Sequence, residues 1–243
     1  MDPWIWLGLC IFIAFGIEAI TGFGSIVIAL SLGALLLPID AMLPVLVPLN
    51  ICMTGYLAVR HRQHIHWPTL LKMILPLMVG GTLLGYLLRP VLGDNTLQIL
   101  FGALVIWFAA RELWRSIRGL KVSQHGGWWT RSWMFVAGIT HGLFASGGPL
   151  LVYALTGTQL SKSAFRATLI SVWLSLNGLL TVVFALDGSL IPALPRIGMM
   201  LPVLLAGVVI GEFLHHRVNE DRFKQLVYTL LLMTGALLII TTL

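Results

Sequence analysis

The stretch Thr21-Gly22-Phe23-Gly24-Ser25 interrupts the first long apolar segment, and Ala145-Ser146-Gly147-Gly148-Pro149 interrupts a second segment in the other half of the chain. Glycine and proline break helices, and unwound backbone at membrane depth is tolerated only where it is buried in protein or lines a cavity. A matched pair of interrupted apolar segments is the best sequence pointer to a transporter's binding site. The two breaks therefore predict both the fold and the place of the site.

The composition around these breaks is that of a membrane protein. Of the 243 residues, 58% are hydrophobic and 10% charged, and the mean hydropathy is +0.95. A spanning helix needs about 20 apolar residues. We expect an all-α polytopic membrane protein with apolar segments near 4–20, 24–37, 41–59, 69–88, 96–114, 132–145, 148–158, 164–186, 192–214 and 223–242.

The two halves of the chain resemble each other. A shift of 123 residues places Gly24-Ser25 over Gly147-Gly148, and a shift of 126 places Gly81 and Gly85 over Gly207 and Gly211. Self-similarity of this kind indicates duplication. We predict a first transmembrane repeat over 1–115, a basic cytoplasmic linker over 116–130, and a second repeat over 131–243.

The positive charges favour one topology for these repeats. Four simple spans per half would divide the Lys and Arg residues nine to six, which is a weak bias. If each break instead marks a discontinuous hairpin, followed by three transmembrane helices, the repeats are inverted and the division is thirteen to two. We expect inverted repeats, both termini outside, and cytoplasmic loops at 60–72, 111–131, 158–166 and 215–224.

The residues after each break begin a short helix, whose N-terminus offers unpaired N–H groups and a partial positive charge. Glycine lets an anion approach such backbone closely. The expected site for a small anion comprises Thr21, Gly22, Phe23, Gly24 and Ser25 with Ser146, Gly147, Gly148 and Pro149. The alternative is that the glycines only permit tight helix crossing, the role that we expect for Gly80-Gly81-x-x-x-Gly85 and Gly207-x-x-x-Gly211.

Polar residues at membrane depth extend this site. Asn50 and Thr54 lie one turn apart, and their repeat counterparts are Trp173 and Asn177. These four either line the cavity or form interhelical hydrogen bonds. Glu18 and His141 are also counterparts; they are candidates for carrying a proton, or else structural groups with satisfied hydrogen bonds.

The sequence gives little support for an enzymatic function. Ser146 with nearby His141 faintly resembles an intramembrane serine protease, but Phe144 stands where a glycine is expected. The His61-x-x-His64-x-His66 cluster has no cysteine or carboxylate beside it, so we expect no metal site. We expect no enzyme, no cofactor and no nucleic-acid partner.

The chain resembles the TauE/SafE family of bacterial membrane proteins, the sulfite and organosulfonate exporters. The resemblance rests on Gly16 to Ser25, on Gly138 to Pro149, and on the alanine-led helices from Ala41 and Ala164. Ser25 and Ser146 stand where the family often has glycine. The resemblance implies transport of a sulfur oxyanion or small organic acid, and it leaves the particular anion open.

We therefore predict a multi-pass secondary transporter of the inner membrane that exports its substrate, with one half rocking against the other around the breaks. Its partners would be a small anion and the lipid bilayer, with protons as a further candidate; the oligomeric state is not predicted. The competing interpretation is a non-transporting assembly or anchoring protein that docks through its basic 111–131 loop.

Overall fold

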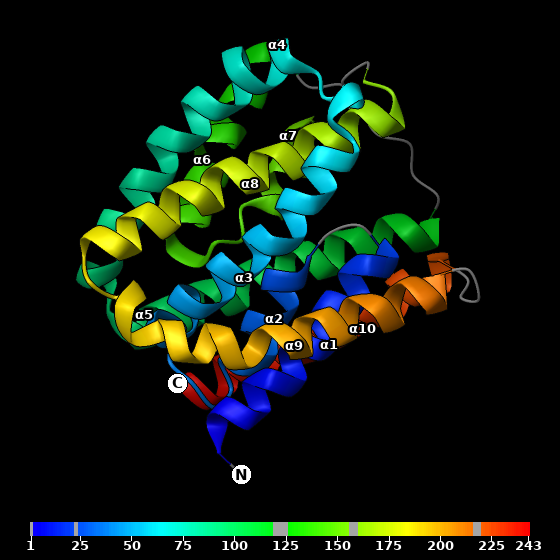
Figure 1. Ribbon diagram of the computed structural model, residues 1–243. Helices are drawn as coiled ribbons and strands as arrows, with labels where there is room; N and C mark the ends of the chain where they lie inside the picture. Colours follow the sequence, from blue (N-terminus) through cyan, green and yellow to red (C-terminus); the bar gives the residue numbers. More distant parts are fainter. Residues whose placement is uncertain (1, 22–23, 119–125, 156–159, 216–219) are drawn as a thin grey trace. The chain divides into compact units, whose positions relative to one another are not determined.

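A computed structural model describes residues 2–21, 24–118, 126–155, 160–215 and 220–243. Every regular element in these ranges is helical (Figure 1). The long helices are α1 (Pro3–Thr21), α3 (Ile39–Arg60), α5 (Leu75–Arg118), α6 (Gly127–Phe144), α8 (Lys162–Leu186), α9 (Leu190–His215) and α10 (Glu220–Thr242). The short elements are α2 (Ser25–Gly33), η1 (Arg62–His64), α4 (Trp67–Thr69), η2 (Leu70–Ile74) and α7 (Gly148–Leu155).

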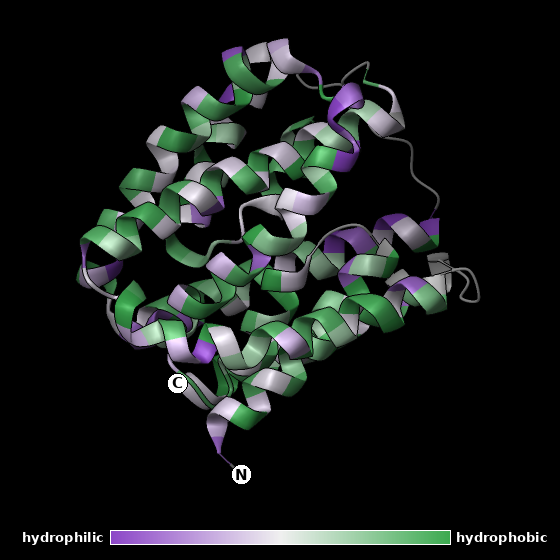
Figure 2. Ribbon diagram, viewed as in Figure 1, coloured by the Kyte–Doolittle hydropathy of each residue, from purple (hydrophilic) through white to green (hydrophobic). Residues whose placement is uncertain are grey.

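Six helical stretches within the described residues are long and apolar enough to cross a membrane. Figure 2 shows the apolar colour along most of the helical ribbon, with hydrophilic residues concentrated towards helix ends. Large apolar side chains such as Leu87, Val209 and Ile240 are exposed, as expected where lipid is the solvent. The predicted all-α polytopic membrane fold is thus confirmed.

The longest apolar stretch, Trp67–Arg118, would measure about 78 Å as one continuous helix, far more than a bilayer's thickness. It is broken at Gly93, whose φ of 69° and ψ of 161° are not helical. A φ in this range strains any residue with a Cβ, so glycine is the residue suited to the position. Gly93 therefore separates the two spans that the hydropathy predicts near 69–88 and 96–114.

The helices group into two compact units. Unit 1 comprises 1–43, 92–121 and 195–243, and unit 2 comprises 44–91 and 122–194. Each unit thus combines segments from both halves of the sequence. The chain passes between the units next to Pro44, near Gly93, within 121–122 and next to Pro195.

Each unit contains one broken hairpin. In unit 1, α1 packs against α2, and in unit 2, α6 packs against α7. The returning helices have nine and eight residues, so they extend about 13 Å and 12 Å. Since the hydrocarbon core is about 30 Å thick, neither returning helix crosses it alone.

Glycines hold a neighbouring helix against each hairpin at backbone distance. In unit 2, a Cβ added at Gly81 or Gly85 of α5 would lie 2.4 Å or 2.1 Å from the carbonyl oxygen of Phe135 or Ile139 in α6. In unit 1, a Cβ on Gly207 or Gly211 of α9 would lie 2.5 Å or 2.3 Å from the carbonyl oxygen of Phe12 or Gly16 in α1. Both predicted tight crossings are confirmed, and they use positions that the proposed repeat places in register.

Candidate functional site

The first break lies in unit 1, and the structure describes it from Gly24 onward. Thr21 is the last residue of α1, while Gly22 and Phe23 lie outside the described residues. Gly24 has a φ of 100°, a left-handed conformation that favours glycine, and its carbonyl accepts the first helical hydrogen bond of α2 from the Ile28 N–H. The turn thus aims the N-terminus of α2 back towards the end of α1.

The N-terminus of α2 already has a carboxyl partner from the same chain. The Ser25 N–H donates to Oε2 of Glu18 at 3.0 Å, and both residues are buried. A carboxylate at this place satisfies one of the orphan N–H groups and interacts favourably with the helix dipole. Glu18 therefore has a structural contact at the first break.

The second break lies in unit 2 and is described completely. Ala145 ends α6 in the left-handed region, with a φ of 50°, and Gly147 accepts the first helical hydrogen bond of α7 from the Leu151 N–H at 3.0 Å. A Cβ on Gly147 would lie 2.3 Å from the Ala137 carbonyl oxygen, so only glycine fits there without a shift of backbone. The hydroxyl of Ser146 donates to the Phe144 carbonyl rather than facing outward as a free donor. Pro149, the second residue of α7, is buried.

Two asparagines from different helices meet in unit 2. Nδ2 of Asn177 in α8 donates to Oδ1 of Asn50 in α3 at 2.7 Å, and both side chains are at least 96% buried. The sequence singled out both residues, and the interhelical hydrogen bond was one of the two roles expected. The Thr54 hydroxyl donates to the Asn50 carbonyl within α3, so Thr54 has an internal partner too.

His141 and Trp173 form the other side of the same group. The two rings stack with centroids 5.9 Å apart and an interplanar angle of 18°. His141 is 99% buried, and neither of its ring nitrogens has a hydrogen-bond partner among the described residues. Asn177 lies close to the imidazole, but its Oδ1 also lacks a partner there. We call Asn50, His141, Trp173 and Asn177 the polar cluster.

The polar cluster adjoins the second break. The Cβ of His141 lies 3.0 Å from where a Cβ on Gly147 would be, and the Trp173 ring lies 3.5 Å from the equivalent point on Gly148. The N-terminus of α7, an imidazole, an indole and two amides are thus gathered within unit 2. Buried polar atoms normally have partners, so three orphaned atoms in one cluster indicate a place for a polar ligand or water.

A second polar group in unit 2 was not anticipated from the sequence. The Tyr86 hydroxyl of α5 donates to the carboxylate of Asp187, in the turn between α8 and α9. The guanidinium of Arg89 lies over the rings of Tyr86 and Phe184, at 5.6 Å and 5.7 Å from their centroids. Arg89 is 93% buried. The available signal was that Arg89 is one of only two basic residues on the face predicted to be outside.

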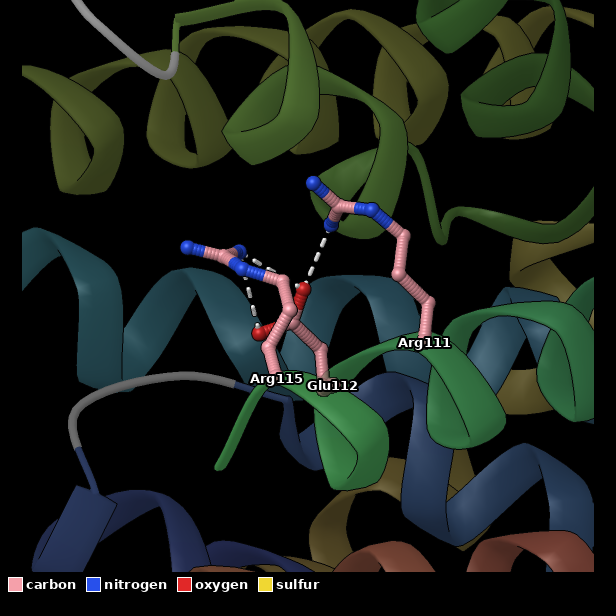
Figure 3. A network of polar contacts seen from close by, with 3 residues as sticks. All are labelled: Arg111, Glu112 and Arg115. Carbon is pink, nitrogen blue, oxygen red and sulfur yellow. Dashed lines mark hydrogen bonds and ion pairs between the residues drawn. The ribbon is translucent and has the colours of Figure 1, made fainter. Parts of the chain in front are cut away.

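The basic residues at the end of α5, in unit 1, are partly neutralised. Figure 3 shows Arg111 and Arg115 converging on the carboxylate of Glu112, with Nη1 of Arg115 3.1 Å from Oε1. Arg118 lies over the Trp114 ring at 3.9 Å. Arg and Trp contacts of this kind at a helix end are typical of membrane interfaces. Of the predicted 116–130 linker that follows, residues 119–125 lie outside the described residues.

In unit 2, the predicted histidine cluster beside α3 is held among cations. His61 lies near Arg166, Arg60 and His64, and partial burial followed by these positive charges lowers the His61 pKa from its ordinary value. The His66 N–H donates to the Thr168 hydroxyl at 3.0 Å, which ties the turn after α3 to α8. A positive surface of this kind attracts anions to the end of unit 2 that carries it.

Comparison with known proteins agrees with this architecture. The family model described as sulfite exporter TauE/SafE matches residues 7–238, nearly the whole chain. No curated protein and no solved structure matches the chain. The family is one of membrane transporters of sulfite and sulfonate type, whose substrates are small anions. On this match the chain belongs to the sulfite exporter TauE/SafE family.

Proposed function

We propose that the chain is a secondary transporter that exports a small sulfur oxyanion, such as sulfite or an organosulfonate, across the bacterial inner membrane. The substrate would bind at the second break, against the N-terminus of α7 and the polar cluster. The observation that carries this proposal is the buried His141 imidazole, whose two nitrogens have no partner among the described residues although it lies beside a helix N-terminus.

The chemistry of this place suits an oxyanion. A helix N-terminus presents N–H donors and a partial positive charge, and glycine at Gly147 and Gly148 leaves the backbone uncovered. An imidazole N–H and an asparagine amide supply further donors without a fixed cation. Because hydrogen bonds from neutral groups bind an anion reversibly, such a site suits release on the far side.

Export of the anion need not be driven by ATP hydrolysis. An inside-negative potential pushes a monovalent anion outward by about 2.3 kcal/mol per 100 mV, so uniport is physically sufficient for export. Glu18 and His141 remain candidates for proton coupling, in which case a pH gradient would change the rate. Alternating access would require one part of the protein to move relative to another around the bound anion.

The proposed topology places the broken hairpins in inverted repeats, with both termini periplasmic. Its support is the thirteen-to-two division of Lys and Arg and the glycine crossings, which occur at equivalent positions of the two repeats. The repeat boundaries at 1–115 and 131–243 follow from the same alignment. The first break, Thr21 to Ser25, would then serve as the counterpart of the binding hairpin.

The test is flux of labelled sulfite from proteoliposomes under an imposed inside-negative potential. We expect wild-type protein to release sulfite, Asn177→Leu to release it at least 10-fold more slowly, and Gly198→Ala to behave as wild type. Gly198 is a matched control because an added Cβ there meets nothing within 4 Å. Absence of flux of sulfite, sulfoacetate and related anions would favour the assembly or anchoring alternative; wild-type flux in Asn177→Leu would exclude this site.

A further inference from the structure

The two broken hairpins have the same local construction. Ile28 donates to Gly24 in the first, and Leu151 donates to Gly147 in the second, each at 3.0 Å. Donors and acceptors are both separated by the 123-residue shift of the repeat. The residue that begins the returning helix is Ser25 in one and Gly148 in the other. The N-termini of α2 and α7 are therefore equivalent positions in the two hairpins.

The first hairpin places a carboxyl group at its helix N-terminus. Oε2 of Glu18 accepts the Ser25 N–H at 3.0 Å, and the residues are 96% and 99% buried. A carboxylate oxygen and a sulfite or sulfonate oxygen are alike in charge and hydrogen-bonding capacity. Glu18 thus shows, within unit 1, how this backbone arrangement receives an oxyanion.

The second hairpin has histidine where the first has glutamate. His141 is the counterpart of Glu18 at the 123-residue shift. It brings no negative charge, it is 99% buried, and its ring nitrogens are unpartnered among the described residues. Its Cβ lies beside Gly147, and its ring stacks on Trp173, whose own ring lies next to the start of α7. An imidazole that can donate a hydrogen bond therefore occupies the repeat position at which the first hairpin has its acceptor, Glu18.

We propose that the chain's own Glu18 fills the oxyanion position of the first hairpin, whereas the substrate fills the equivalent position of the second. One substrate oxygen accepts the Gly148 N–H, as Glu18 accepts that of Ser25, and a second oxygen accepts an N–H of His141. This inference rests on the proposed function and deepens it. It assigns one anion per chain, bound within unit 2.

The surroundings of this position restrict the ligand. Pro149 has no N–H, so the first turn of α7 offers the N–H groups of Gly148 and Leu150 alone. The Trp173 ring, 3.5 Å from the Cβ position of Gly148, forms an apolar wall there. Two converging donors and an apolar wall suit a compact head group with at least two oxygens. Sulfite, sulfonates and small carboxylates share that head group, and halides do not.

The test replaces the side chains at the two equivalent positions, His141 and Glu18. In purified protein, sulfite binding is measured by isothermal titration calorimetry for wild type, His141→Glu, His141→Gln and Glu18→Ala. His141→Glu introduces a carboxylate of the kind the first hairpin accommodates, and like charge costs several kcal/mol, so affinity should fall at least about 100-fold. His141→Gln keeps a neutral donor and should lose about 10-fold or less. Wild-type affinity in His141→Glu would overturn the proposal.

Glu18→Ala provides a second, independent test of the proposal. It can be carried out even if His141→Glu does not elute as a folded protein. Emptying the first hairpin should add a second equivalent of bound sulfite, while the matched variant Glu18→Gln, which keeps a neutral acceptor oxygen in place, should retain one. Folded Glu18→Ala with a single equivalent contradicts the proposal. If wild type binds no sulfite or sulfonate, the proposed function itself fails, a result distinct from either of these.

Discussion

Replacing Gly85 with alanine tests the packing that fixes the second hairpin. The added Cβ would lie 2.1 Å from the Ile139 carbonyl oxygen and 3.1 Å from the Cα of Gly142, both backbone atoms that no rotamer change can move. Ordinary van der Waals contact begins near 3.4 Å, so α5 and α6 must separate by about 1.3 Å. Because His141 precedes Gly142 on α6, this separation also displaces the polar cluster.

Overpacking of this kind costs about 1–3 kcal/mol, and the contact here is at the severe end because backbone meets backbone. For a chain of this size, 1 kcal/mol corresponds to roughly 2–4 °C in the unfolding midpoint. We expect Gly85→Ala to lower the midpoint by about 5–12 °C and to abolish most sulfite flux.

The assay is thermal unfolding of detergent-solubilised protein followed by size-exclusion chromatography, with flux measured in parallel. Gly198→Ala is the control: its Cβ meets nothing within 4 Å, and removing a helical glycine gains about 0.5–1 kcal/mol in general. A midpoint for Gly85→Ala equal to that of Gly198→Ala would refute the inferred helix crossing.

Three further predictions concern other parts of the chain. Asn177→Leu removes the amide that donates to the buried Asn50 side chain, so the unfolding midpoint should fall by the equivalent of about 1–3 kcal/mol; an unchanged midpoint would show that this hydrogen bond contributes nothing. Partial burial would raise the Asp187 pKa, but hydrogen bonds from Ser189 and Tyr86 and the charge of Arg89 hold it below its ordinary value. A carboxyl group whose pKa is lowered by folding stabilises the folded state at pH values above its ordinary pKa of ~4. That stabilisation is lost as the pH falls through the lower pKa of the folded state. The midpoint of wild type should therefore decline more steeply below pH ~4 than that of Asp187→Asn, and parallel curves would contradict this. A C-terminal alkaline phosphatase fusion should be active and a C-terminal fluorescent fusion dark; the reverse pattern would exclude periplasmic termini.

Helix positions were largely predictable because hydropathy and glycine spacing report on them directly. Predicted segments 41–59 and 192–214 correspond to α3, Ile39–Arg60, and α9, Leu190–His215. The crossings at Gly81 and Gly207 were predictable too, since small residues four apart leave room for backbone. The first returning helix is shorter than expected, since α2 ends at Gly33 rather than near 37. Residues 156–159, where the second was expected to end, lie outside the described residues.

The pairing of polar side chains was not predictable in the same way. Asn50 and Asn177 were both singled out, but their hydrogen bond depends on how α3 packs on α8, which no local pattern encodes. The Glu18 contact with Ser25 joins residues on either side of the first break, and no local pattern predicts it. Tyr86 and Asp187 were missed because each is unremarkable alone and they meet only through the packing of unit 2.

The crossing of α1 by α9 has a consequence for biogenesis. Gly16 meets Gly207, and roughly 190 residues separate them in the chain. At synthesis rates of about 5–20 residues per second, α1 enters the bilayer some 10–40 s before its partner exists. During that interval its glycine-lined face contacts lipid or the insertion machinery, whereas α6 emerges with Gly81 and Gly85 already made. Unit 2 can therefore assemble while the ribosome is still translating, and the completion of unit 1 must wait for the end of the chain.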